Sequence, residues 1–474
     1  MKKIRFLGLL LAFAVAISCI AGAAPARAVG TDDSVTRGCH SPDAAVPLSD
    51  SGKLTETANA VLIYELNSDT FLYGYNQDAR IYPSSMVKLM TALVALENGN
   101  LEDQVTVTKR ALSYVQMGSV SAGLVAGEVL TLEQLLYCMM VASANDAATV
   151  IAEYIGGTQD GFLAMMNRRA QELGCRDTNY TNVHGLHDEN TYTTARDICR
   201  IMTVAMKNEA FRTMFRAESY TVPATNKAEE RQVWTTNYMM STQSVKKYYD
   251  ARVTGGKTGA TNEAGRCLVA TAEGGGMELL TIVMGAVPEY EQDGLAVKYF
   301  GSFEETKVLL DYVFDKYVYS QVLFDGQAVT QFPVEGGLNS VVVRPAVSAS
   351  TVLPVGTTGA QLTWIYGDAV GSLEAPVEQG QVLSTIQVWY GAKCLAQTEL
   401  VAMNGVAEGQ PETGEGPRLE KTTSPIWKWL LIGVCCVIGL GVVVMGVILL
   451  RRGILRSIRT ARRRRRRNDR QRSR

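Results

Sequence analysis

The chain has 474 residues, of which 47% are apolar and 20% are charged. This length predicts two to four structural units with a large buried core, and this composition excludes a largely disordered chain. The formal net charge of −1 conceals an asymmetry, because thirteen arginines and one acidic residue follow Leu450 while the rest of the chain is acidic.

The first residues have the pattern of an export signal. Three basic residues precede an apolar run over 6–24, and a small-x-small motif follows at 26–28. Signal peptidase recognises such a motif at the end of an apolar run. We therefore predict a signal peptide over 1–28 and a mature chain that starts near Val29. An uncleaved signal anchor is the alternative.

The region 55–320 alternates between strand and helix patterns. Strands precede a block of helices and return after it, which implies a mixed sheet with helices packed on it, an α/β or α+β fold. Thr131 and Gln134 have capping-box spacing at one helix start, and glycines 274–276 predict a hairpin between two strands. The predicted strands are 60–65, 70–75, 266–273 and 277–286, and the predicted helices are 86–99, 132–140, 146–155 and 304–319.

The last third of the chain changes character twice. Short alternating runs separated by glycine turns predict a small all-β sandwich domain over 325–403. Residues 404–425 are rich in Gly, Pro, Glu and Thr and lack apolar periodicity, so we predict a linker or stalk. The 25 residues of 426–450 contain one charge, Lys428, and predict a transmembrane helix.

The basic tail 451–474 fixes the predicted topology. Arginines that directly follow a membrane span are typical of its cytoplasmic side, so the segment between the signal and the span is expected outside the cell membrane. We expect the tail to contact anionic membrane lipid. Nucleic-acid binding is the alternative use of such a tail, and we expect no nucleic-acid partner.

The cysteines say little about whether the protein contains disulfides or free thiols. Export permits disulfides, but several cysteines lie in apolar runs where a buried free thiol is equally compatible. None has C-x-x-C spacing, so we expect no metal site, and nothing in the sequence implies a cofactor. The cysteines of the predicted external part are Cys39, Cys138, Cys175, Cys199, Cys267 and Cys394.

An S-x-x-K motif, Ser85 to Lys88, lies at a predicted helix start. Residues i and i+3 of a helix share a face, so the Lys88 amine can reach the Ser85 hydroxyl. A serine hydroxyl needs a base to become a nucleophile, and a lysine whose pKa is lowered by burial and positive neighbours can be that base. The helix start also offers free N–H groups to an oxyanion. A second S-x-x-K, Ser244 to Lys247, lies in a polar stretch and is predicted to be solvated.

Two further motifs follow in order. An S-x-N at 143–145 separates two helical patterns, so that a loop can present a hydroxyl and an amide; alone, the same residues are typical of a helix cap. A K-T-G at 257–259 precedes the predicted hairpin, where a glycine on an edge strand lets a substrate backbone approach. Alone, the K-T-G motif favours an ordinary strand-entry turn over a binding site.

The ordered set S-x-x-K, S-x-N and K-T-G is typical of serine penicillin-binding proteins and related β-lactamases. With it, the chain resembles the low-mass D-alanyl-D-alanine carboxypeptidases from about Asn59 to about Ala402. The resemblance implies a β-lactamase/transpeptidase-like domain, peptidoglycan stem peptides ending in D-Ala-D-Ala as substrates, and β-lactam antibiotics as inhibitors. Further matching segments are Tyr82 to Ser85, Ser143 to Ala147, His184 to Leu186, Thr194 to Asp197, Thr236-Asn237 and Gly256 to Thr261.

The resemblance also implies a catalytic role for four residues. Ser85 would carry the acyl group after the terminal D-alanine leaves, and Lys88 would accept its proton. Ser143 and Asn145 would relay protons and hold the substrate amide. Water would then release the shortened peptide.

Substrate binding is implied for the third motif. Lys257 and Thr258 would bind the substrate carboxylate, beside Gly259 on the edge strand. The backbone N–H groups of Ser85 and Ala260 would form the oxyanion hole. His184, although polar, is expected to make structural hydrogen bonds.

The sequence departs from this family in three respects. It has a membrane span where family members often have an amphipathic helix, Ala144 where glycine is common, and Ala260 where histidine is frequent. Three rival functions stay open at this point: a serine β-lactamase, a non-enzymatic β-lactam sensor that signals across the membrane, and a D,D-endopeptidase. We expect the carboxypeptidase.

Overall fold

The computed structural model describes residues 52–241, 245–291, 297–367 and 373–409. The predicted signal peptide, membrane span and arginine-rich tail lie outside these residues, as does most of the predicted linker. Among the helices within the described ranges, none is both long enough and apolar enough to cross a membrane.

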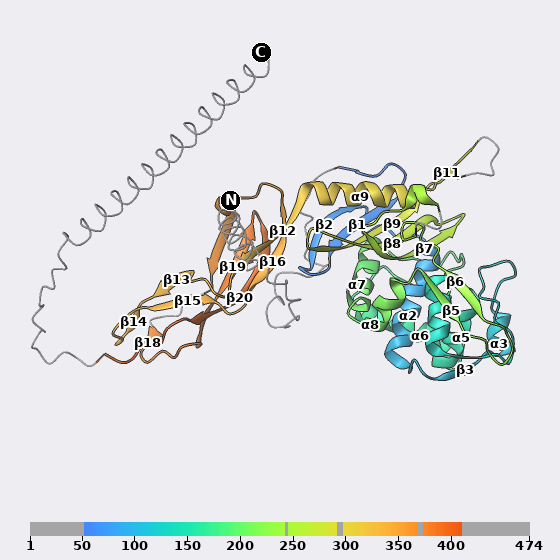
Figure 1. Ribbon diagram of the computed structural model, residues 1–474, viewed down its shortest axis with the longest axis horizontal. Coiled ribbons are helices and arrows are strands. Elements are labelled where there is room, and N and C mark those ends of the chain that lie inside the picture. The colour runs from blue at the N-terminus through green and yellow to red at the C-terminus, as the bar shows by residue number, and fades with distance from the viewer. Residues whose placement is uncertain (1–51, 242–244, 292–296, 368–372, 410–474) are drawn as a thin grey trace, which may run out of the picture. The chain divides into compact units, whose positions relative to one another are not determined.

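A five-stranded sheet is the centre of the larger region (Figure 1). Its strand order is β2-β1-β9-β8-β7, and every neighbouring pair is antiparallel. The prediction of a mixed sheet is therefore wrong: β7, β8 and β9 are consecutive hairpin strands, and β9 runs beside β1 in the opposite direction. The strands are β1 Ala60–Glu65, β2 Thr70–Tyr75, β7 Val253–Thr261, β8 Gly265–Gly274 and β9 Met277–Ala286.

Side chains of this sheet alternate between two hydrophobic layers, as the two-residue period of a strand requires. In β1, Leu62 and Tyr64 pack in the layer that contains most of the helices, whereas Val61 and Ile63 pack with helix α9 (Ser302–Lys316) on the other face (Figure 1). Strand β9 is buried along its whole length. Its sequence is mostly apolar, with Glu278 and Thr281 as the polar exceptions, as expected for a strand that is covered on both faces.

The helical block is built around α2 (Val87–Asn98), whose residues from Val87 to Ala95 are all buried. A helix that is apolar on every side belongs inside a helical layer. The predicted capping box at Thr131 and Gln134 is confirmed at the start of α4. The other elements of this region are η1 Ser84–Met86, β3 Gln104–Thr106, α3 Lys109–Ser113, β4 Val129–Thr131, α4 Leu132–Val141, α5 Asn145–Gly156, α6 Gln159–Glu172, α7 Ala195–Ala205, α8 Glu209–Phe215, β5 Ser219–Val222, β6 Arg231–Trp234, η2 Lys246–Tyr248, β10 Glu289–Tyr290 and β11 Val297–Tyr299.

The region after α9 is all-β, as expected, and its main sheet has the order β13-β15-β20-β19-β17. The helix predicted to reach residue 319 ends at Lys316, because the β-branched and aromatic residues from Tyr317 form β12 and pair with β16. The strands are β12 Tyr317–Leu323, β13 Thr330–Phe332, β14 Val334–Glu335, β15 Val341–Pro345, β16 Ala349–Pro354, β17 Leu362–Tyr366, β18 Leu373–Glu374, β19 Val382–Tyr390 and β20 Lys393–Ala402, with the turn η3 Gly359–Gln361.

Two sequence interpretations need correction or refinement here. The linker was predicted from Asn404, but Val406 is buried in the hydrophobic core of the all-β region and bridges to Val377. Those first residues therefore belong to the folded region. Of the external cysteines, four are buried free thiols, which is one of the two states that the sequence allowed: Cys138, Cys175, Cys199 and Cys267.

Candidate active site

Ser85 lies in the short helix η1, directly before α2, as predicted. The turn brings the Lys88 amine, which is fully buried, to 3.2 Å from the Ser85 hydroxyl oxygen. The preceding residue, Ser84, has a φ of +49°, a conformation that L-residues adopt rarely and that is common at functional sites. The nucleophile candidate therefore sits on a constrained turn with a lysine within hydrogen-bond distance.

The S-x-N motif reaches the same lysine from the start of α5. Asn145 is the first residue of that helix, and its side-chain oxygen accepts a hydrogen bond of 2.7 Å from Lys88 Nζ. Ser143 precedes the helix with a φ of +62°. Both side chains are almost wholly buried.

The K-T-G motif lies on β7, which is an edge strand as predicted. Lys257 donates a hydrogen bond of 2.8 Å to the Ser143 hydroxyl, so the second and third motifs also meet. Thr258 shares a hydroxyl–hydroxyl hydrogen bond with Thr236. Ala260 is exposed next to them on the same strand.

Gly259 explains why the third motif ends in glycine. A Cβ built at this position would lie 3.2 Å from both the Ser84 Cβ and the Ser85 backbone nitrogen. The strand and the helix start are therefore in close approach, and a side chain would crowd the backbone that carries the nucleophile.

Burial lowers the pKa of both lysines, and the charge of Lys257 acts in addition on Lys88. Loss of solvent lowers the pKa of Lys88 well below its ordinary value, and the positive charge of Lys257 lowers it further. Burial alone lowers the pKa of Lys257 to about 7. Both effects favour the neutral form of Lys88, which is the form that a general base needs.

His184 contributes through its backbone. Its carbonyl oxygen accepts a hydrogen bond of 2.5 Å from Lys88 Nζ, while its ring nitrogen Nδ1 accepts one from the Leu186 backbone. Burial, together with Lys88, lowers the pKa of the imidazole to about 4, so the ring is neutral and structural, as expected. A motif made of side chains cannot indicate which backbone carbonyl a residue will contact. The sequence therefore did not predict the hydrogen bond between Lys88 and the His184 carbonyl.

Thr236 was also missed as a site residue, although its segment was noticed. The hydroxyl that it presents to Thr258 comes from a stretch between β6 and β7, and only the fold brings the two together. The second S-x-x-K is different: Lys246 and Lys247 are exposed, which confirms the solvated interpretation for these two residues.

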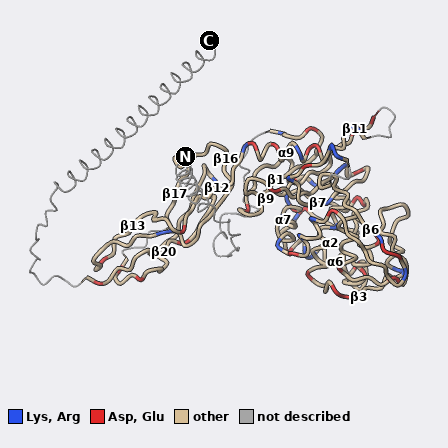
Figure 2. Tube along the Cα trace, in the orientation of Figure 1, with Lys and Arg blue, Asp and Glu red and all other residues tan. Residues whose placement is uncertain are grey.

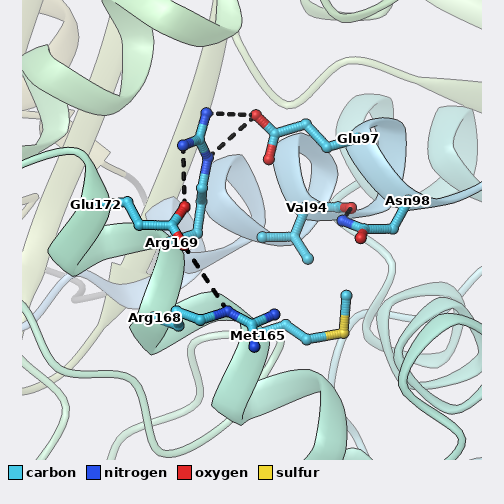
Figure 3. A pocket seen from close by; sticks show the side chains of 7 residues that line it. All are labelled: Val94, Glu97, Asn98, Met165, Arg168, Arg169 and Glu172. Atoms are coloured by element: carbon cyan, nitrogen blue, oxygen red, sulfur yellow. Dashed lines mark hydrogen bonds and ion pairs between the residues drawn. The ribbon is translucent and has the colours of Figure 1, made fainter.

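A surface hollow between α2 and α6 lies apart from the three motifs (Figure 3). Its polar groups are satisfied among themselves, since Arg169 donates to Glu97 at 2.7 Å and to Glu172 at 3.2 Å. This hollow therefore offers no unpaired group for chemistry, and the motif residues form the better candidate site.

Comparison with known proteins decides the family. A family model described as D-alanyl-D-alanine carboxypeptidase matches residues 48–287. The chain belongs to the D-alanyl-D-alanine carboxypeptidase family. It is accordingly a serine-type carboxypeptidase, and its three motifs all lie within the matched residues.

Two curated relatives of this carboxypeptidase extend the match beyond that region. It is 28% identical to the D-alanyl-D-alanine carboxypeptidase DacF of Bacillus subtilis over 361 residues, which cover 74% of this chain and 86% of the relative. It is 29% identical to DacA of Haemophilus influenzae over 387 residues, which cover 80% and 90%.

Solved structures agree on the fold of the carboxypeptidase. Penicillin binding protein 5 from Haemophilus influenzae superposes with a TM-score of 0.58 at 27% identity and covers 76% of this chain and 100% of its own. A peptidoglycan synthesis regulatory factor from Streptococcus pneumoniae, at 24% identity, has a TM-score of 0.60 over 74% of this chain and supports the fold alone.

Proposed function

We propose that this carboxypeptidase removes the terminal D-alanine from peptidoglycan stem peptides through an acyl-enzyme on Ser85. The observation that carries the proposal is the buried Lys88 amine, which contacts the Ser85 hydroxyl, the Asn145 amide and the His184 carbonyl together. A lysine whose lowered pKa favours its neutral form, held by two acceptors and facing a serine, has the geometry of a base paired with its nucleophile.

Acylation begins when Lys88 takes the proton of Ser85 and the freed oxygen attacks the carbonyl carbon of the penultimate D-alanine. The negative charge that develops on the carbonyl oxygen is received by the N–H groups of Ser85 and Ala260. Support for this oxyanion hole comes from the close approach of β7 to the helix start at Gly259. As the C–N bond breaks, the proton that Lys88 took from Ser85 passes through the Ser143 hydroxyl to the amine of the departing D-alanine, and Lys88 is neutral again.

The substrate carboxylate is held by the third motif. Lys257 carries a positive charge below its pKa of about 7, and Thr258 adds a hydroxyl on the same strand. Asn145 orients the substrate amide while it holds Lys88. Deacylation repeats this chemistry with water as the nucleophile. Lys88 takes a proton from water, the hydroxide attacks the ester carbonyl, the bond to the Ser85 oxygen breaks, and Lys88 returns its proton to that oxygen. β-Lactams acylate the same serine.

We further propose that the enzyme is exported and anchored by a single membrane span, with its catalytic domain outside and its basic tail in the cytoplasm in contact with lipid. The signal pattern over 1–28 and the apolar run over 426–450 followed by arginines support one topology. The all-β domain then stands between the catalytic domain and the membrane segment in chain order.

The test measures D-alanine release from a diacyl-D-alanyl-D-alanine peptide by the full chain in detergent. Ser85→Ala is expected to lose at least about a thousandfold in rate, because it removes the hydroxyl that the Lys88 amine contacts. Ser84→Ala is the matched control, since the adjacent Ser84 hydroxyl is buried and makes no hydrogen bond among the described residues, and its rate stays within about threefold.

Two outcomes of the same assay contradict the proposal. Fast hydrolysis of benzylpenicillin without D-alanine release indicates a β-lactamase. A stable penicilloyl adduct with no turnover of either compound indicates a sensor.

A further inference from the structure

One buried carboxylate joins the loop 120–124 to the first turn of α5. Asp146, 1% exposed, accepts hydrogen bonds through Oδ2 from the Ser121 hydroxyl at 2.5 Å and from the Leu124 backbone at 3.0 Å. Its Oδ1 accepts from the Ala122 backbone at 2.9 Å. Three groups of a loop that precedes β4 are therefore held by one side chain of the helix.

The neighbouring residue makes the same connection from its backbone. The Asn145 N–H donates a hydrogen bond of 2.8 Å to the Val120 carbonyl, while the Asn145 side chain holds Lys88. The loop and the S-x-N motif are thus fastened to each other at two successive residues. A movement of the loop changes the position of the Asn145 amide relative to Lys88.

Helix stabilisation alone does not account for Asp146. An acidic residue in the first turn interacts favourably with the helix dipole and with free N–H groups. Asp146 makes one such bond within its own helix, to the Ala147 backbone at 2.9 Å. Its other three hydrogen bonds are donated by the loop. Stabilisation of the helix start does not require them.

The charge of Asp146 also acts on the catalytic lysine, Lys88. The charged groups that act on Lys88 from the elements around it are Lys257 on β7 and Asp146 on α5, and the neighbouring His184 ring is itself affected by the charge of Lys88. The negative charge of Asp146 raises the pKa of Lys88, against the lowering by burial and by Lys257. Removal of this negative charge therefore favours neutral Lys88 at lower pH.

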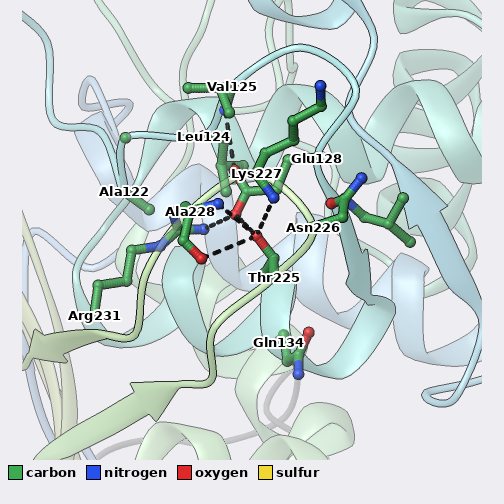
Figure 4. Close-up of polar contacts among 12 residues, drawn as sticks. Ala122, Leu124, Val125, Glu128, Gln134, Thr225, Asn226, Lys227, Ala228 and Arg231 are labelled. Carbon is green, nitrogen blue, oxygen red and sulfur yellow. Dashed lines mark hydrogen bonds and ion pairs between the residues drawn. The ribbon is translucent and has the colours of Figure 1, made fainter.

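The far end of the loop has a separate anchor (Figure 4). Glu128 is fully buried and accepts from the Val125 backbone at 3.1 Å, from Thr225 at 3.0 Å and from Arg231 at 2.6 Å. This second carboxylate holds the loop without being among the charges that act on Lys88. It offers a matched comparison.

We propose that Asp146 is a positioning residue of the reaction. It fastens the loop 120–124 to the S-x-N motif, and its negative charge opposes the effect that the positive charge of Lys257 has on Lys88. The proposal rests on the role of Lys88 as the base. It adds to the three motifs a residue that touches neither substrate nor nucleophile.

The experiment records the acylation rate by a fluorescent penicillin against pH for the full chain in detergent. Asp146→Asn keeps the size of the side chain but removes its charge. It also replaces one carboxylate oxygen by an NH2 group, which cannot accept the two hydrogen bonds that each oxygen now accepts. We expect the rate at the pH optimum to fall by about tenfold or more, and the acid limb to move to lower pH by about half a unit or more. Asp146→Glu keeps the charge, so its acid limb stays at the wild-type pH while its optimum rate falls.

The variant Glu128→Gln distinguishes the effect of a loosened loop from the effect of a lost charge near Lys88. It loosens the far anchor, so its optimum rate falls, but its acid limb stays at the wild-type pH. The inference is overturned if Asp146→Asn has the wild-type profile, or if Glu128→Gln moves the acid limb as far as Asp146→Asn does. Full acylation by Lys88→Met overturns the proposed function itself, a result that the Asp146 variants cannot produce.

Discussion

Two lysines with lowered pKa values share this site, and the proposed mechanism gives them opposite tasks. Lys88 must be neutral to accept a proton, and Lys257 must be charged to bind a carboxylate. Burial lowers the pKa of both, and the charge of Lys257 lowers that of Lys88 further, so the two requirements are compatible only over a limited range of pH.

This arrangement predicts a bell-shaped pH dependence of kcat/KM for a peptide ending in D-alanine. On the acid side, the rate falls where Lys88 becomes protonated, which its lowered pKa places well below the pH at which a free lysine would gain its proton. On the alkaline side, kcat/KM falls above about pH 7, because Lys257 loses its charge and no longer attracts the carboxylate.

The control for this profile is a peptide whose terminal carboxylate is amidated. It should lose the alkaline limb and keep the acid limb, since only Lys88 then matters. A kcat/KM that climbs steadily from pH 7 to pH 10 for the acid peptide would show that Lys88 has an ordinary pKa.

At this scale the sequence predicted side chains and missed backbone contacts. Ser85, Lys88 and Asn145 come together, and Lys257 meets Ser143, as the motif spacing and the family resemblance indicated. The His184 carbonyl could not be predicted, because every residue has a carbonyl and only the fold selects one. The same holds for the bonds between Asp146 and the loop, which need the loop's path.

Among the elements, the start of α2 is held from two sides by glycines. Gly259 of β7 approaches it from one side, and Gly185, with a φ of +84°, approaches the Ser84 carbonyl from another. A Cβ built at Gly185 would lie 1.9 Å from that carbonyl oxygen. The helix start, and with it the nucleophile, depends on the absence of a side chain there.

Gly185→Ala is expected to slow acylation by at least about a hundredfold, because the backbone of Ser84 must shift to admit the methyl group. Gly157→Ala is the matched control: Gly157 also has a positive φ, of +69°, but a Cβ there has open space. It should cost about 1 kcal/mol of unfolding free energy and leave acylation unchanged. Equal acylation rates for the two variants, measured with a fluorescent penicillin, would contradict this account.

Secondary structure was largely predictable, whereas strand direction was not. The strands around the turn at 67–69 and the glycine hairpin at 274–276 follow from turn chemistry and local pattern, and the structure confirms them. The all-antiparallel sheet does not follow, because the pairing of β1 with β9 joins segments more than 200 residues apart. The end of α9 at Lys316 was missed for a related reason, since β12 exists only through its pairing with β16.

For the whole molecule, charge and anchoring are the properties that matter for a wall-trimming enzyme. Basic and acidic residues are interspersed over the described chain (Figure 2), so no charge block there competes with the arginine-rich tail as a determinant of topology. The proposed topology therefore depends on the segments 426–450 and 451–474 of the sequence.

Deletion of 426–474 is expected to release active enzyme into the soluble fraction, because the proposed span is removed while the described domains are kept. Deletion of 451–474 alone should leave the enzyme with the membrane, since an apolar helix of this length suffices for insertion. Fractionation followed by labelling with fluorescent penicillin measures both. A membrane-bound enzyme after the larger deletion would contradict the proposed anchor.

The central claim is that one of the two S-x-x-K serines in this chain carries the acyl group, and peptide mapping tests it most directly. The full chain is incubated with benzylpenicillin, digested, and analysed by mass spectrometry for a penicilloyl group. The account predicts the adduct on the peptide containing Ser85, with none on the peptide containing Ser244 and none in Ser85→Ala. An adduct on any other residue, or one that persists in Ser85→Ala, would contradict it.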